Sequence, residues 1–194
     1  LHWSCRSRID TVNEDLLTKM AEAGCKRIYY GIESVDQNVL DNVKKRLDAK
    51  KVRGIINMTQ KHGIMALGFF MIGNPGETRE SALANIEFSK SLDLKYVQWS
   101  IAIPKPNTSL EMEYIEKTGE DFWKGYMVGE VKEKRFKNMY STLPDEEMYK
   151  LITLAYKKFY FRPKILIYHV LRIRSFEEFK RYVKTGIKIL NEKF

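Results

Sequence analysis

The residues best placed for chemistry in this sequence stand at the ends of short apolar runs. Glu33 closes the run 27–33, where its carboxylate could bind a ribose hydroxyl or an amino group. Acidic side chains also favour helix N-termini, so the residues alone favour a capping or loop-bracing role for Glu33. Arg6 and Arg8 end an earlier run, and binding of a carboxylate or phosphate is about as well supported there as a surface ion pair.

A glycine turn at residues 73–77 is the feature around which the sequence is organised. Residues 68–72 form an aromatic, apolar run typical of a buried strand. Asn74-Pro75-Gly76 follows as a turn, because Pro fixes φ and Gly permits positive φ. We expect a ligand to approach this backbone closely, since strand-to-helix turns of α/β proteins bind ligands. Glu77 is expected to brace the loop or to accept a hydrogen bond.

The thiol and imidazole side chains form no recognisable metal-binding pattern. Cys5 and Cys25 stand on different predicted elements, and each is interpreted as a lone, small buried hydrophobe. The three histidines are scattered along the chain, so no metal-ligating residue is predicted. No nucleophile–base pair is evident, and no Gly-Lys-Ser/Thr follows the glycine turn as a P-loop requires.

Alternating strands and helices must position these residues. Strands are predicted at 3–9, 27–33, 68–72 and 95–103, with helices between them. A Thr-x-x-Glu capping box at 11–14 is expected to open the first helix, and Thr78 the helix after the glycine turn. The alternation predicts parallel βαβ units whose strand ends, including Arg8, Glu33 and Gly73, share one edge. Four strands make an open sheet or an arc of a barrel.

Composition and charge restrict the class of protein. The 194 residues are 44% hydrophobic and 30% charged, which are globular values, and no apolar run is long enough to span a membrane. With two cysteines and no leader pattern, a cytoplasmic location is expected. The chain starts at Leu1 and enters a strand-like run at once, which leads us to expect a fragment of a longer protein.

The C-terminal part of the chain is predicted to be a helical region at 109–194. Residues 120–194 hold 17 Lys and Arg against 10 Asp and Glu, so most of the net charge of +9 lies there. A solvated, lysine-rich surface is the favoured interpretation. A nucleic-acid-binding face is the alternative, and it is weaker because no RNA-binding signature accompanies the charge.

Four segments together resemble the radical S-adenosylmethionine (SAM) superfamily, in the group whose members often carry a cobalamin-binding domain. The segments run from Trp3 to Asp10, from Met20 to Ser34, from Gly68 to Thr78 and from Pro104 to Thr108. Each motif alone is weak, but their order and spacing are specific. The resemblance covers residues 1–108, and residues 109–194 resemble the family more loosely.

This resemblance implies a fold and a SAM site. The fold would be the last four strands of a six-stranded, partial (β/α) TIM-like barrel at 1–108, followed by a helical C-terminal appendage at 109–194. By position, Glu33 matches the residue that holds the ribose or methionine end of SAM, and Lys45 a basic residue that can pair with the SAM carboxylate. Arg8 matches the basic end of a strand. The turn from Gly73 through Pro75 to Glu77 matches the loop that lines the adenine.

The sequence departs from the family in the segments that bind the iron–sulfur cluster and the SAM amino group. The Cys-x-x-x-Cys-x-x-Cys loop that holds a [4Fe–4S] cluster is missing, and so is the glycine-rich strand that contacts the SAM amino group. The resemblance therefore implies a chain that contributes SAM contacts and part of the substrate pocket. The cluster, and cobalamin if the protein uses it, would be bound by other segments, and this chain alone would be inactive.

Three functions remain open from the sequence. The first is part of a radical SAM enzyme, with or without cobalamin, performing methyl transfer or another radical reaction on an unknown small molecule. An upstream domain of the same polypeptide would then be its partner. The second is an RNA-modifying radical SAM enzyme whose basic C-terminal region binds RNA. The third is a non-catalytic binding protein or a decayed half-barrel.

Overall fold

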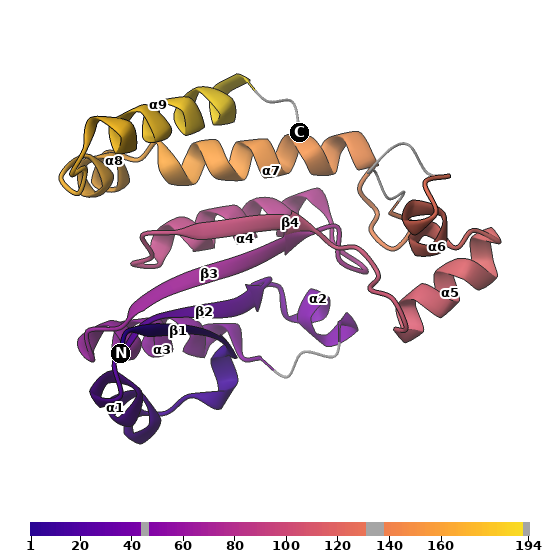
Figure 1. Cartoon of the computed structure of the whole chain (residues 1–194). Helices are drawn as coiled ribbons and strands as arrows, with labels where there is room; N and C mark the ends of the chain where they lie inside the picture. Colours follow the sequence, from indigo (N-terminus) through magenta and orange to yellow (C-terminus); the bar gives the residue numbers. More distant parts are fainter. Residues whose placement is uncertain (44–46, 131–137, 192–194) are drawn as a thin grey trace.

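A four-stranded, all-parallel sheet forms the centre of the computed structural model, which describes residues 1–43, 47–130 and 138–191 (Figure 1). The strands lie in sequence order. They are β1 (Trp3–Arg8), β2 (Cys25–Glu33), β3 (Met65–Ile72) and β4 (Val97–Ile101). The predicted fold class is thus confirmed, because strands that alternate with helices can pair in parallel through right-handed crossovers.

Helices follow each strand. Those up to β4 are the 3₁₀ turn η1 (Ile9–Thr11), α1 (Glu14–Glu22), α2 (Gln37–Asn42), α3 (Ala49–Lys61) and α4 (Arg79–Ser91). Those after β4 are α5 (Ser109–Thr118), α6 (Phe122–Met127), α7 (Asp145–Tyr160), α8 (Pro163–Val170) and α9 (Phe176–Asn191). The helices α5 and α6 lie beyond the carboxyl ends of the strands, whereas α8 and α9 lie toward the other end (Figure 1).

Two predicted helix starts have different outcomes. Thr78 caps α4 as expected, by accepting a hydrogen bond from Ser81 N at 3.2 Å. The capping box at Thr11 was wrong. Thr11 belongs to η1, and the side chain of Asn13 caps α1 by accepting from Leu16 N. An Asn side chain competes well for this role because its short carbonyl reaches the free N–H groups of the first turn.

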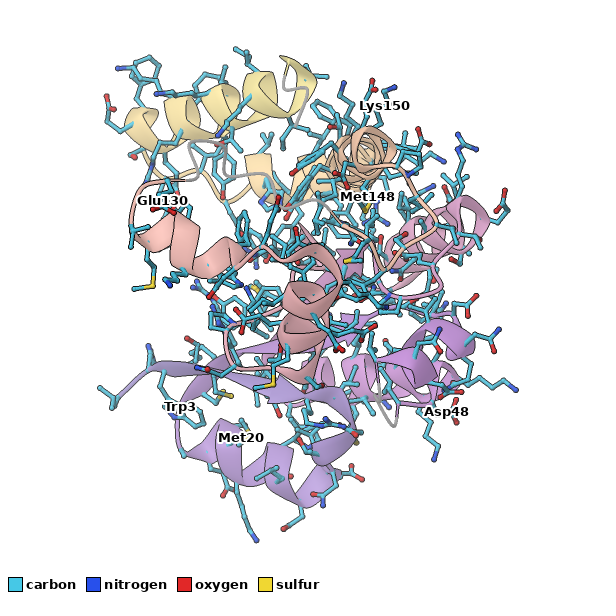
Figure 2. The ribbon with its side chains drawn as sticks, turned by 90° about the vertical axis from the view of Figure 1, so that its right-hand side faces the viewer. Trp3, Met20, Asp48, Glu130, Met148 and Lys150 are labelled. Carbon is cyan, nitrogen blue, oxygen red and sulfur yellow. The ribbon has the colours of Figure 1, made fainter. Side chains whose placement is uncertain are left out.

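The core lies between the sheet and one layer of helices. Alternate residues of β2, including Ile28 and Ile32, are fully buried, and Tyr30 donates or accepts a 2.8 Å hydrogen bond with Thr59 of α3. Buried residues of α7 belong to the same cluster. Figure 2 shows Met148 on the side of α7 that faces the sheet, where it is fully buried, and Lys150 on the opposite side.

The strand residues on the other face are open to solvent. Tyr29, Leu67 and Phe69 are half-buried, and Arg6 and Gln98 are exposed. A search of the described residues finds no helix with the length and hydrophobicity of a membrane-spanning segment.

Candidate functional site

The candidate site lies where β1, β2 and β3 end, at one edge of the sheet. Arg8 pairs with Gly31 in the strand register, Glu33 with Phe70, and Gly73 directly follows β3. The structure therefore brings Arg8, Glu33 and the turn 73–77 to a common edge, as the alternation of strands and helices predicted. Lys45 lies outside the described residues.

Glu33 adopts a strained backbone conformation at the end of β2. Its φ is +65°, and Ser34 N donates a 2.9 Å hydrogen bond to Ile32 O across it, so Glu33 is the central residue of a γ-turn. A γ-turn with positive φ is rare and strained for a residue with a side chain. Such strain persists only where the surrounding structure holds it, and it concentrates at functional sites.

Asn85 is the residue that holds this turn. Its side chain comes from α4, is fully buried, and donates to Glu33 O at 2.8 Å. The sequence analysis did not identify Asn85. The signal was available, because an amide between the buried positions Ala82 and Ile86 of an amphipathic helix needs a polar partner.

Glu77 braces the glycine turn, which confirms the bracing role expected for it. Its carboxylate is fully buried and accepts hydrogen bonds from Gly73 N at 2.5 Å and Asn74 N at 3.2 Å. Burial raises the pKa of Glu77 to about 7, although the two backbone hydrogen bonds oppose that shift. Glu77 thus fixes the shape of the loop between β3 and α4.

The close approach expected at the glycine turn is made by the protein itself. Gly73 has a φ of +91°, and a Cβ there would stand 2.5 Å from Met148 Sδ and 2.7 Å from Asn138 Nδ2. Asn138 donates to Gly73 O at 2.6 Å and to Ala102 O at 3.2 Å. Pro75 O accepts from Asn42 Nδ2 at 3.0 Å. Asn138 lies 65 residues from Gly73, so no local pattern could have revealed this contact.

The arginines of β1 have different surroundings. Arg8 is exposed and forms a 2.7 Å ion pair with Asp10. A surface ion pair was one of the two interpretations that the sequence left open for this arginine. The pKa of Arg8 is raised by its hydrogen bond to that carboxylate. Arg6 lies over the ring of Phe69, with its guanidinium carbon 5.5 Å from the ring centroid.

The residues present fit SAM in part and a [4Fe–4S] cluster not at all. The Glu33 carboxylate is a hydrogen-bond acceptor, and hydroxyl and ammonium groups are donors that suit it. A cluster held by thiolates needs three or four cysteines, and the chain has two. The two thiols lie near each other, although they are 20 positions apart in the sequence. Burial raises the pKa of Cys5, and the neighbouring Cys25 raises it further. Among the described residues, no group of three or more His, Cys, Asp and Glu side chains could hold a metal ion.

Comparison with known proteins finds methyltransferases among the relatives. The chain is 35% identical to an uncharacterised methyltransferase of Pyrococcus horikoshii over 181 residues, which are 91% of this chain and 38% of that protein. It is 29% identical over 113 residues to the cytidylyl-2-hydroxyethylphosphonate methyltransferase of Streptomyces wedmorensis, covering 55% of this chain and 21% of that one. The chain therefore spans well under half the length of these curated relatives.

A solved structure shows the same fold. The radical SAM methyltransferase TsrM of Kitasatospora setae, solved with cobalamin and a [4Fe–4S] cluster bound, superposes with a TM-score of 0.55 at 20% identity. The match covers 60% of this chain and 23% of TsrM. The family model described as "Radical SAM superfamily" matches residues 2–88, which hold β1 to β3 and the strained Glu33. Residues 2–88 are therefore the part of this chain that matches the radical SAM superfamily.

Proposed function

We propose that this chain forms the SAM-binding edge and part of the substrate-facing wall of a cobalamin-dependent radical SAM methyltransferase. The similarity to methyltransferases and the fold shared with TsrM support the reaction class. The observation that carries the proposal is the γ-turn at Glu33. A glycine would adopt its positive φ without strain, yet a carboxylate stands there, at the edge of the sheet where α/β proteins bind ligands.

Each residue of the edge would have a limited task. The Glu33 carboxylate would accept hydrogen bonds from the ribose hydroxyls or the ammonium group of SAM. The backbone from Gly73 to Pro75 would line the adenine, and Glu77 would hold that backbone in place. Arg8 would contribute positive potential, reduced by Asp10. Lys45 is proposed as a partner of the SAM carboxylate on sequence resemblance alone.

The redox cofactors would lie outside this part of the protein. In a radical SAM enzyme the cluster supplies the electron that cleaves SAM, and cobalamin can carry the methyl group. Because Cys5 and Cys25 are too few for the cluster, we propose that other segments of the polypeptide bind it. The residues described here bind and orient SAM and substrate.

Replacement of Glu33 tests the proposal. The protein is produced from its complete coding sequence and reconstituted without oxygen, and SAM affinity is measured by equilibrium dialysis. We expect Glu33→Gln to weaken SAM binding about 10-fold or more, since a charged hydrogen bond is replaced by a neutral one. Glu33→Gly is expected to lose affinity as well, while raising the free energy of unfolding by about 1 kcal/mol through relief of strain.

Product analysis tests the reaction class in the same preparation. Formation of 5′-deoxyadenosine or S-adenosylhomocysteine with the wild-type protein supports a radical SAM methyltransferase. The proposal fails if the reconstituted protein holds no cluster and consumes no SAM. Unchanged SAM affinity in both Glu33 variants would remove Glu33 from the site and leave the reaction class standing.

A further inference from the structure

The open face of the sheet carries an ordered set of side chains that the SAM edge does not use. In the register of the parallel strands, Arg6 stands opposite Tyr29 and Tyr29 opposite Leu67, while Phe69 stands opposite Gln98. Paired residues of neighbouring strands point to the same face. The residues that alternate with them, such as Ile28 and Phe70, are fully buried under the helices.

Positive charge dominates this face. Arg6, Arg8 and Arg27 are exposed on it. Glu33 follows at the carboxyl end of β2, after a register shift that comes between Gly31 and Glu33. Arg8 is paired with Asp10. None of the ion pairs found among the described residues involves Arg6 or Arg27. Strand geometry puts the Cα atoms of these two arginines about 8 Å apart.

A stacked aromatic pair lies beside these charges. Tyr29 and Phe69 stack with their ring centroids 5.7 Å apart and their planes inclined by 19°. Arg6 extends over the Phe69 ring. The ring fixes the planar guanidinium while leaving its N–H groups to bind an anion. The face thus combines three exposed polar side chains, Arg6, Arg27 and Gln98, with the half-buried rings of Tyr29 and Phe69. A bound ligand could form hydrogen bonds with the polar groups and bury the rings.

We propose that this face binds a methyl-acceptor substrate that combines a planar ring with an anionic group such as a phosphate or carboxylate. Arg6 and Arg27 would bind the anion, and the Tyr29–Phe69 pair would contact the ring. Tyr29 precedes Glu33 by four residues, about 13 Å along β2, so the substrate and SAM would occupy successive parts of one surface. This inference rests on the proposed function and names the substrate class for it.

Three small probes separate the two halves of the recognition. With the complete protein saturated with SAM, we measure the dissociation constants of 1-naphthyl phosphate, 1-naphthol and inorganic phosphate. The naphthyl phosphate is expected to bind at least 10-fold more tightly than either of the others. Arg6→Gln is expected to weaken naphthyl phosphate about 10-fold and to leave naphthol unchanged. Phe69→Leu is expected to weaken both ring-containing probes several-fold.

Matched variants keep the outcome interpretable. Arg181→Gln on α9 removes the same charge away from the sheet and is expected to change no affinity. Arg6→Lys keeps the charge but loses the planar guanidinium that lies over Phe69, so its affinity for naphthyl phosphate should fall between those of wild type and Arg6→Gln. Unchanged SAM affinity in each variant reports an intact fold.

Two results would overturn the inference while the proposed function stands. One is equal binding of naphthyl phosphate and naphthol by a protein that binds and consumes SAM. The other is an Arg6→Gln variant with the naphthyl phosphate affinity of Arg181→Gln. If SAM is neither bound nor consumed, the proposed function has failed instead, and Arg6-dependent probe binding would then describe an anion site of another enzyme class.

Discussion

At the scale of single residues, the buried carboxylate of Glu77 decides the shape of the loop after β3. One carboxylate oxygen accepts both backbone hydrogen bonds from the turn, and the other has no partner among the described residues. A fully buried carboxylate with one free oxygen is poorly solvated, which explains why burial raises its pKa to about 7. The same carboxylate links loop geometry to pH.

The stability of the protein is therefore expected to depend on the protonation of Glu77. The folded-state pKa lies above the ordinary value of 4.5, so the folded protein holds this proton more tightly than the unfolded chain does. This contribution to the free energy of unfolding is fully present below pH 4.5 and is lost as the pH rises through 7. Its upper limit is about 3 kcal/mol.

Urea unfolding of the wild type and of Glu77→Gln between pH 5 and 8 tests this expectation. The Gln side chain still accepts from Gly73 and Asn74 but does not titrate. The wild type should therefore lose stability relative to the variant as the pH rises. Groups common to both, such as His169, cancel in the difference. Two parallel stability curves would contradict the raised pKa.

Gly73 is required by its backbone and by its neighbours together. Gly73→Ala is expected to lower the free energy of unfolding by about 1 kcal/mol for the positive φ, and by a further 1–3 kcal/mol for displacing Met148 and Asn138. Gly63 provides the control, because its φ is +73° and a Cβ there would meet nothing within 4 Å. Thermal or urea unfolding should show Gly63→Ala to be clearly milder. Equal losses would mean that the neighbours move aside freely.

At the scale of elements, α7 covers the β4 edge of the sheet with two tyrosines. Tyr160 accepts from Val97 N at 3.1 Å and donates to Val97 O at 2.8 Å. Tyr156, one turn earlier, does the same for Trp99 at 3.0 and 3.1 Å. The residues of β4 whose peptide groups point away from β3 are thus satisfied by hydroxyls. An edge strand left open would invite pairing with another chain.

Removal of both hydroxyls should expose this edge. Tyr156→Phe combined with Tyr160→Phe keeps the packing but leaves four backbone groups of Val97 and Trp99 without partners. We expect a loss of about 2–5 kcal/mol in the free energy of unfolding and concentration-dependent association. Sedimentation velocity and urea unfolding measure the two effects. A monomeric double variant of wild-type stability would show that water replaces the hydroxyls.

At the scale of the whole molecule, Asn138 joins the C-terminal helices to the edge of the sheet that carries the candidate site. Its amide donates to the carbonyls that follow β3 and β4 and accepts from Tyr140 N and Ser141 N. Its own backbone N–H donates to Asp145 at the start of α7, at 3.1 Å. Thr142 adds a 2.8 Å hydrogen bond to Glu77 O. The segment before α7 therefore holds the glycine turn from outside the sheet.

Asn138→Asp is the sharpest test of this connection. The carboxylate has the same shape but cannot donate, and it would face the carbonyls of Gly73 and Ala102. We expect a loss of about 2–4 kcal/mol in the free energy of unfolding and weaker SAM binding. Asn57→Asp on the exposed side of α3 is the control for the charge change. SAM affinity that stays at the wild-type value would show that the turn keeps its shape without Asn138.

The sequence by itself determined the parallel sheet and the edge on which the site residues meet. Period-two apolar runs separated by amphipathic helices admit few other arrangements, and parallel strands must bring their carboxyl ends to one side. Arg8, Glu33 and Gly73 could therefore be placed at a common edge. The bracing role of Glu77 was equally accessible, because it lies within four residues of the groups it binds.

Tertiary structure alone decided which groups hold that edge. Contacts between distant segments determine four features of the site and its surroundings. These are the strain at Glu33, the hydrogen bond from Asn85 to it, the hydrogen bond from Asn138 to Gly73, and the tyrosines over β4. The same is true of the Arg6–Phe69 contact on the open face. Such contacts depend on register and on the packing of helices against the sheet. Local propensity predicts neither the register nor the helix packing. Both arise only when segments 50 or more residues apart come together around one core.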